Sequence, residues 1–284
     1  MLREKQYKGE GEFALLQKGG IAYLQSSLLE KSGLVDHAFS TRIGGCSSGS
    51  FHSLNMAFHT GDSEMSVLEN RRRFFNLFNY NSRSQVSAVQ VHGIESAVFN
   101  EKNRGEGACP GTAVKHCDAL ITTEPGLPLA AYSADCQLIF FVSTGKPIVA
   151  LAHAGWRGAL GGTGVSLIKR LKKEFFIDLD ELLVALSPAI CRDCYMVDEK
   201  IARMFQDAGY SDPAYLEPVS NGFFKLDLTA VNEKQLLRAG INKENLAKNS
   251  WCSSCNDDLF YSYRRDRGIT GRMLGFIAIR SGKG

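Results

Sequence analysis

The sequence predicts an α/β fold with mixed sheets, in one domain that spans residues 1–284. Short apolar runs typical of strands outnumber the helical patterns, and the helical patterns separate groups of strands. No linker or internal repeat divides the chain. With 284 residues, of which 44% are hydrophobic and 22% charged, the chain is long enough and apolar enough to bury a large core.

The predicted strands are apolar runs bounded by glycine, proline or polar turns. We expect strands at 13–16, 21–24, 35–39, 87–92, 118–122, 128–132, 182–190 and 272–280. Helical spacing of apolar residues predicts a helix that begins at Asp62 or Ser63 and runs to about Asn79. Further helices are expected at 164–175, 198–208 and 229–239.

A strand–turn–strand pattern in residues 132–158 brings reactive residues together. The turn at 144–147 returns the chain on itself, so Cys136, at the start of the first strand, and His153, at the end of the second, meet at one sheet edge. A thiolate and an imidazole so placed can share a soft or borderline metal, or form a nucleophile–base pair. Buried packing is the alternative for the cysteine.

His92 ends another predicted strand, which makes it a third potential ligand beside Cys136 and His153. The spacing of the three matches no short metal motif, so the metal hypothesis depends on their placement at strand ends. Catalytic zinc commonly takes three protein ligands and leaves a fourth position for water or substrate. Hydrogen-bonded core histidines are the alternative reading.

A glycine-rich segment, 158–164, follows His153 and Arg157 and precedes a predicted helix. A loop of this kind can direct backbone N–H groups at an anion, and Arg157 and Arg42 could add charge-assisted bonds to a phosphate. The segment matches neither dinucleotide-binding nor P-loop patterns. Close packing of the glycines, with arginines on the surface, explains it equally well.

The chain contains eight cysteines, four of them in two CxxC pairs, Cys191/Cys194 and Cys252/Cys255. The interval between the pairs is far longer than the about 15–20 residues of a zinc ribbon, so the spacing disfavours a shared structural zinc. One pair could instead be redox-sensitive or simply buried. The N-terminal 20 residues lack a signal-peptide pattern, which predicts a cytoplasmic protein with reduced thiols.

Composition argues against two classes of partner. The net charge of +3, from 33 basic and 30 acidic residues, is weak and dispersed, and Arg71, Arg72 and Arg73 form a short run on an expected helix surface. We therefore expect no nucleic acid as a partner. We also expect no membrane, because no stretch approaches the about 20 apolar residues of a membrane span.

Several short motifs occur in an order that resembles a known family. They are Thr41-Arg42-Ile43-Gly44-Gly45, Ser53-Leu54-Asn55, Gln90-Val91-His92-Gly93, Ala134-Asp135-Cys136, His153-Ala154-Gly155-Trp156-Arg157-Gly158 and Ser262-Tyr263-Arg264-Arg265-Asp266. This set resembles the bacterial laccase-domain family, once named multicopper polyphenol oxidases and now described as zinc-dependent purine nucleoside phosphorylases. The resemblance runs from about residue 35 to residue 276.

The resemblance implies a layered α/β/β/α fold similar to the catalytic domain of cytotoxic necrotizing factor toxins. It implies phosphorolysis of adenosine, inosine, guanosine and S-methyl-5'-thioadenosine, together with adenosine deamination. It also implies a site made of zinc ligands and pocket residues. The ligands would be His92, Cys136 and His153, and the pocket residues Arg42, Asn55, Gln90 and Arg157.

Phosphorolysis needs a phosphate held against the ribose, and deamination needs a group that carries protons, for which Asp135 is the candidate. A copper-dependent polyphenol oxidase is one alternative, although the six histidines form no His-x-His pair and copper could only replace zinc at one site. A cysteine hydrolase with Cys136 as nucleophile and His153 as base is another. The chain could be a monomer or a homodimer.

Overall fold

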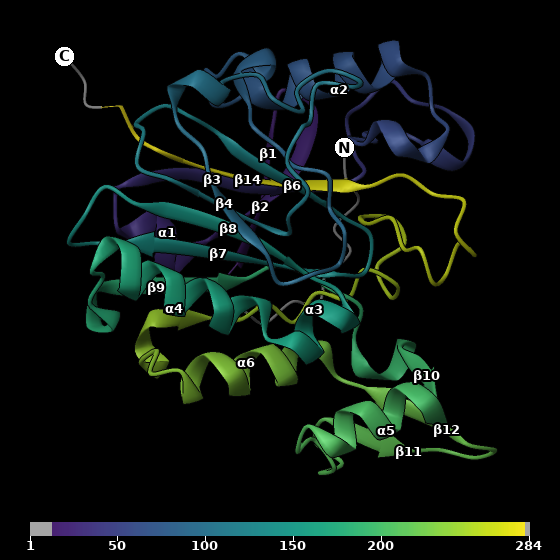
Figure 1. Cartoon of the computed structure of the whole chain (residues 1–284). Helices are drawn as coiled ribbons and strands as arrows, with labels where there is room; N and C mark the ends of the chain where they lie inside the picture. The colour runs from purple at the N-terminus through teal and green to yellow at the C-terminus, as the bar shows by residue number, and fades with distance from the viewer. Residues whose placement is uncertain (1–12, 282–284) are drawn as a thin grey trace.

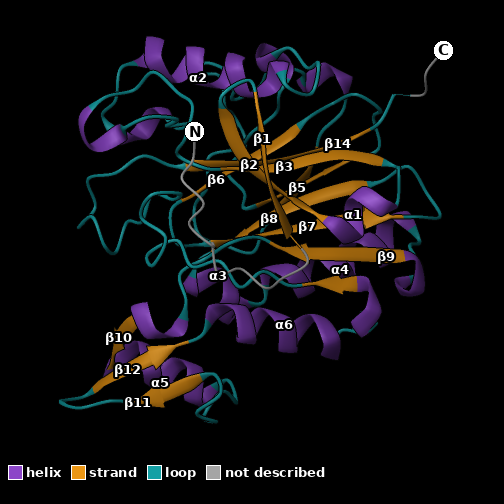
Figure 2. Cartoon of the chain, turned by 180° about the vertical axis from the view of Figure 1, so that it is seen from behind, coloured by secondary structure: helices purple, strands orange, loops and turns teal. Residues whose placement is uncertain are grey.

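The computed structural model describes residues 13–281 and contains three β-sheets with helices packed around them (Figures 1 and 2). The five-stranded sheet is antiparallel and has the strand order β1 (Phe13–Lys18), β2 (Ile21–Ser26), β3 (Val35–Ser40), β14 (Met273–Ile279), β6 (Leu129–Ser133). The six-stranded sheet has the order β13 (Leu246–Ala247), β9 (Leu182–Leu186), β7 (Gln137–Ser143), β8 (Val149–Ala154), β5 (Ala119–Thr122), β4 (Ser96–Val98).

The six-stranded sheet is mixed, because its two outer pairs, β13–β9 and β4–β5, are parallel while the pairs between them are antiparallel. The third sheet is small, with the order β10 (Met196–Asp198), β12 (Phe223–Leu226), β11 (Leu216–Pro218). The α-helices are α1 (Ser27–Lys31), α2 (Glu64–Asn76), α3 (Trp156–Gly161), α4 (Thr163–Phe175), α5 (Glu199–Asp207) and α6 (Leu228–Arg238). Short 3-10 helices are η1 (Gly49–Phe51), η2 (Phe58–Thr60), η3 (Ser82–Ser84), η4 (Glu101–Asn103), η5 (Leu179–Glu181), η6 (Arg192–Cys194) and η7 (Lys243–Asn245).

The two larger sheets pack face to face, and their facing side chains form the largest core cluster. Leu24 and Phe39 enter it from the five-stranded sheet, and Phe140 and Leu151 from the six-stranded sheet. A second cluster joins the other face of the six-stranded sheet to α4 and α6, and a third joins the outer face of the five-stranded sheet to α2. The layers are therefore helix, sheet, sheet, helix, with α2 above and α4 and α6 below in Figure 1.

This arrangement confirms the predicted mixed α/β fold; the single domain and the likeness to the toxin domain remain predictions. The third sheet packs with α5 at one end of the molecule and was not expected, because its strands are only three or four residues long. None of the helices in residues 13–281 is long and apolar enough to cross a bilayer.

The strand expected at 87–92 is wrong. Only isolated bridges form there, between Val86 and Leu129 and between Val89 and His116. The chain then turns sharply at His92, whose φ of 59° lies in the left-handed region. An alternating apolar pattern predicted a strand, but the backbone N–H groups of 91–93 bond to one side chain instead of a neighbouring strand.

Arg71 corrects the expectation that residues 71–73 lie on a helix surface. Its side chain is buried, and its guanidinium donates to the backbone carbonyls of Met56, Gly107 and Ala108. The guanidinium also stacks on the ring of Tyr132, 4.7 Å from its centroid. Arg71 thus ties α2 to two loops, while Arg72, the next residue, pairs with Glu69 in solvent.

Candidate active site

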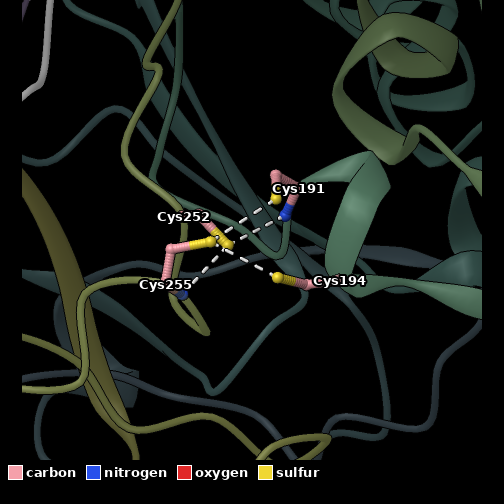
Figure 3. Close-up of side chains that lie close together, drawn as sticks. All are labelled: Cys191, Cys194, Cys252 and Cys255. Atoms are coloured by element: carbon pink, nitrogen blue, oxygen red, sulfur yellow. Dashed lines mark hydrogen bonds between the residues drawn. The ribbon is translucent and has the colours of Figure 1, made fainter.

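Two groups of potential metal ligands gather among residues 13–281, and in each the ligand atoms all lie within 4.8 Å of one another. One is His92, Cys136 and His153. The other joins both CxxC pairs, whose four sulfurs meet in Figure 3. The long interval in sequence between the pairs disfavours a shared site, but the fold brings the two pairs together.

The β7–β8 hairpin brings Cys136 and His153 together, as the strand–turn–strand pattern predicts. Gln137 pairs with Ala154, and Leu138 with His153, so Cys136 at the mouth of β7 lies beside the end of β8. His153 is 2% exposed, whereas Cys136 is partly exposed and open to a ligand. The two side chains are held by strands that are buried along their whole length.

The carboxylate of Asp118 orients both histidines of the group and was not identified from the sequence. Oδ1 accepts a hydrogen bond from the His153 ring Nδ1 at 2.8 Å and one from the backbone N–H of His92 at 3.1 Å. Oδ2 accepts from the backbone N–H groups of Val91 and Gly93, at 3.1 and 2.7 Å. Because Nδ1 of His153 is bonded to Asp118, its Nε2 is the nitrogen available to a metal or a proton.

His92 completes the group from the turn at 91–93. Its ring meets that of His153 edge to face, with centroids 5.0 Å apart. Unlike His153, His92 is exposed, so the group opens to solvent on its side. The group thus has one buried ligand, one exposed ligand and a partly exposed thiol.

Burial and charge act in opposite directions on the pKa values of this pair. Burial alone would raise the pKa of Cys136, but the neighbouring His153, together with hydrogen bonds from His153 and His92, lowers it to about 6. For His153, burial alone would lower the pKa, but the Cys136 thiolate and Asp118 raise it to about 9. The pair therefore favours a thiolate, which is the form that binds metals and attacks carbonyl carbons.

Gly155 leaves no room for a side chain beside this group. A Cβ at that position would lie 2.9 Å from the Cys136 sulfur and 3.1 Å from Cδ2 of His92. Real Cβ atoms are rarely found at such separations from their neighbours, so the ligands would have to move. Glycine is required here by close approach, not by backbone conformation.

Asp135 is buried, and its backbone φ of 94° is unusual for a residue with a side chain. Its Oδ1 accepts from the Ser253 hydroxyl at 2.6 Å and its Oδ2 from the backbone N–H of Arg264 at 2.7 Å. Burial raises the pKa of this carboxyl above its usual value, although both hydrogen bonds act against the rise. Asp135, which directly precedes Cys136, is thus hydrogen-bonded to the loop before β14.

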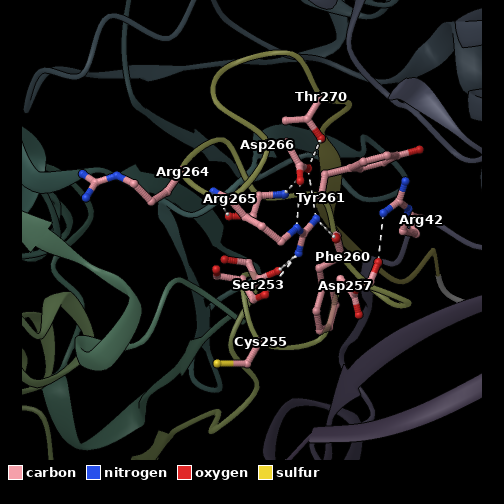
Figure 4. Close-up of polar contacts among 12 residues, drawn as sticks. Arg42, Ser253, Cys255, Asp257, Phe260, Tyr261, Arg264, Arg265, Asp266 and Thr270 are labelled. Atoms are coloured by element: carbon pink, nitrogen blue, oxygen red, sulfur yellow. Dashed lines mark hydrogen bonds and ion pairs between the residues drawn. The ribbon is translucent and has the colours of Figure 1, made fainter. Parts of the chain in front are cut away.

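Arg42, Asn55 and Gln90, which the resemblance places in the pocket, all use polar atoms to hold loops. Arg42 donates to the carbonyls of His52 and Asp257 and stacks on Tyr261 (Figure 4). Asn55 is fully buried, and its amide bonds to four neighbouring residues: Ala57, Thr60, Asp62 and Arg272. Gln90 forms a pair of hydrogen bonds with the backbone of Tyr132.

Three further arginines differ in what they contact. Arg157 is exposed at the start of α3 and stacks on Trp156, and its guanidinium forms no hydrogen bond or ion pair with residues 13–281. Arg265 turns inward, pairing with Asp266 and donating to loop carbonyls (Figure 4). Arg264 points away from that loop and stacks on Tyr195. Of these three arginines, only Arg157 has a guanidinium without a hydrogen-bond partner in the part of the chain that the structure describes.

Comparison with known proteins identifies the family. Residues 36–280 match the model of the family described as multi-copper polyphenol oxidoreductase laccase. The chain belongs to this laccase-domain family. The relative named purine nucleoside phosphorylase YlmD from Geobacillus stearothermophilus is 39% identical over 242 residues, covering 84% of this chain and 88% of the relative.

Further similar proteins and structures support this family assignment. The Bacillus subtilis protein of the same name is 32% identical over 85% of this chain and 87% of its own. The crystal structure of YlmD from Geobacillus stearothermophilus superposes with a TM-score of 0.90 at 36% identity, covering 95% of this chain and all of that one. A Bacillus licheniformis hypothetical protein, YfiH, gives a TM-score of 0.88 at 31% identity, covering 94% of this chain and 99% of that one.

Proposed function

We propose that this protein is a zinc-dependent purine nucleoside phosphorylase with His92, Cys136 and His153 as its zinc ligands. The observation that carries the proposal is the approach of these three ligand atoms to within 4.8 Å, with His153 oriented by Asp118. The names of the similar proteins from Geobacillus and Bacillus support the reaction class. Adenosine, inosine, guanosine and S-methyl-5'-thioadenosine are the proposed substrates, with phosphate.

The residues present fit a zinc ion. Two imidazoles and one thiolate are ligands that zinc accepts, and three protein ligands with one open side are the usual pattern of a catalytic site. The carboxylate behind His153 is the partner that zinc-binding histidines commonly have. When bound, the ion would supply a Lewis acid to the site.

The protein's own side chains would bind and orient the substrates. Arg157, whose guanidinium has no hydrogen-bond partner among residues 13–281, is the proposed phosphate ligand, because guanidinium binds phosphate through two parallel hydrogen bonds. Arg42 and Gln90 would shape the nucleoside pocket through the loops that they hold, as would Asn55. Phosphate held against C1′ of the ribose is the arrangement that phosphorolysis requires.

Adenosine deamination is the second proposed activity, with Asp135 as the group that carries protons. The raised pKa of its buried carboxyl suits this role. Its two hydrogen bonds to the loop before β14 give it a positioning role as well. Asp135→Asn should therefore lower inosine formation from adenosine, and full deamination by this variant would exclude the shuttle.

A copper-dependent polyphenol oxidase is less well supported. Among residues 13–281, the His92/Cys136/His153 group is the only cluster of potential ligands that contains histidine. A laccase needs several coppers held mostly by imidazoles. Copper in place of zinc at this one site would allow slow oxidation at most.

One observation favours a second candidate, a cysteine hydrolase. The Cys136 thiolate contacts the His153 imidazole, which in turn is hydrogen-bonded to the Asp118 carboxylate. The pKa of the thiol is lowered to about 6. The predicted likeness to cytotoxic necrotizing factor toxins would accommodate this chemistry. In that case His153 would act as the base, and Asp118 would hold its ring.

Purified protein of known metal content, incubated with adenosine with and without phosphate, tests the proposal. Phosphate-dependent adenine supports phosphorolysis, and inosine supports deamination. Cys136→Ser should abolish both, while Cys109→Ser, on a surface turn outside the group, should retain them. Activity that survives chelation but is lost with iodoacetamide would favour the hydrolase and contradict the zinc enzyme.

A further inference from the structure

The two CxxC pairs come from separate parts of the chain and meet beside the small third sheet (Figure 3). Cys191 directly precedes η6 and Cys194 is its last residue, between β9 and β10, while Cys252 and Cys255 lie in the loop before β14. A bridge between Ala189 and Cys252 aligns the two segments. The cysteines belong to neither the hairpin nor the turn that forms the candidate active site.

The sulfur positions match a tetrahedral metal site. Four thiolates around zinc at about 2.3 Å form a tetrahedron whose edges are about 3.8 Å long. The Cys255 sulfur lies 3.9 Å from that of Cys191 and 3.3 Å from that of Cys194, and all four sulfurs lie within 4.8 Å of one another. Disulfide sulfurs are only about 2.05 Å apart, so these cysteines are not bonded to each other.

Backbone N–H groups point at one of these sulfurs. Cys252 Sγ accepts from the N–H of Cys191 at 3.2 Å and from that of Cys255 at 3.3 Å (Figure 3). Such donors stabilise the negative charge of a thiolate, and four thiolates on one divalent ion leave a net charge of −2 to be offset. The cluster therefore resembles a prepared ligand set more than a packing of neutral thiols.

We propose that Cys191, Cys194, Cys252 and Cys255 bind one Zn²⁺ as a structural site, separate from the His92/Cys136/His153 group. Four sulfur ligands suit zinc, and a full tetrahedron leaves no position for water or substrate. The proposal does not depend on the reaction assigned to the other group.

The position of the four-cysteine site implies a structural role for the metal. Ser253, between two of the ligands, bonds to the Asp135 carboxylate at 2.6 Å, and Asp135 is followed directly by Cys136. The backbone N–H of Ser253 bonds to the carbonyl of Ala189, and its carbonyl accepts from Arg265. A metal that fastens this loop to the segment after β9 also fixes Asp135 beside the candidate active site.

Metal analysis of the full chain tests the proposal. We expect two zinc ions per chain in the wild-type protein and one in Cys136→Ser. X-ray absorption of the Cys136→Ser protein should then show four sulfur neighbours at about 2.3 Å and no nitrogen. A Cys136→Ser protein without zinc, a remaining zinc with nitrogen ligands, iron in its place, or a disulfide between Cys194 and Cys255 in mass spectra would overturn it.

The double variant Cys252→Ser/Cys255→Ser should lose one zinc and exchange the backbone amides of residues 250–265 faster. Cys46→Ser, whose thiol is exposed and outside both groups, is the control and should keep two zinc ions. Two zinc ions in the double variant would contradict the site. If this variant does not fold, the measurements on wild type and Cys136→Ser still decide, and they do not require any activity.

Discussion

Asp118→Asn is the most informative single substitution, because one buried carboxylate serves two of the three proposed ligands. The wild-type oxygens accept four hydrogen bonds: two at Oδ1, from His153 and from the backbone of His92, and two at Oδ2, from the backbone at Val91 and Gly93. Asparagine offers one oxygen and one NH₂ group. Whichever way the amide is turned, two of the four donors then face another donor.

The magnitude follows from that count. A buried donor left without an acceptor costs about 1–3 kcal/mol, so two cost about 2–6 kcal/mol of unfolding free energy. If the amide oxygen takes the Oδ2 position, His153 loses the partner that fixes its ring. Losing such a partner typically weakens metal binding 10- to 100-fold.

Chemical denaturation and competition with a zinc chelator measure the two effects. Glu199→Gln is the matched control, because it neutralises a carboxylate whose ion pair with Arg203 is exposed and contributes about 0–1 kcal/mol. A folded Asp118→Asn protein with wild-type zinc affinity would refute the orienting role of Asp118. Loss of stability without loss of affinity would limit Asp118 to holding the turn.

Two further predictions concern packing and pH. Gly155→Ala should displace Cys136 and weaken zinc binding, whereas Gly93→Ala, whose added Cβ meets neighbours at 3.6 Å or more, should bind zinc normally; equal affinities would contradict the close approach. His37 is buried, and burial lowers its pKa from 6.5 to about 4, so the unfolded chain binds the extra proton between these values. The free energy of unfolding should therefore fall by about 3 kcal/mol as pH drops from 6.5 to 4. Denaturant titrations of His37→Gln should show a smaller fall over the same pH range. A fall equal to that of the wild-type protein would refute this account.

The hairpin could be predicted from the sequence because its information is local. Two apolar runs on either side of a turn that contains Gly145 and Pro147 predict antiparallel strands, and the strand pairing then follows from the turn. Cys136 and His153 lie at opposite ends of that unit, so their meeting needs no knowledge of the rest of the fold. The same holds for the helix at Leu228–Arg238, whose cap at Asp227 is a local signal.

Asp118 and the four-cysteine group could not be found in this way. The contact of Asp118 with His153 depends on β5 lying beside β8, a pairing of segments more than 25 residues apart. The meeting of Cys194 with Cys255 depends on where β9 and the loop before β14 lie after the sheets have packed. Spacing rules describe compact zinc modules, and they do not apply when the fold itself closes the interval.

His92 is the residue on which the two candidate chemistries differ. A cysteine hydrolase needs only Cys136, His153 and Asp118, and the hairpin with β5 holds all three without the exposed ring of His92. A zinc site of three protein ligands needs His92 as well. His92→Ala should therefore remove the zinc of this group and abolish phosphate-dependent adenine formation, while leaving the Cys136 thiol reactive toward iodoacetamide. A His92→Ala protein that retained full phosphorolysis would exclude the zinc site, since the turn at 91–93 contributes no other side chain able to replace the ligand.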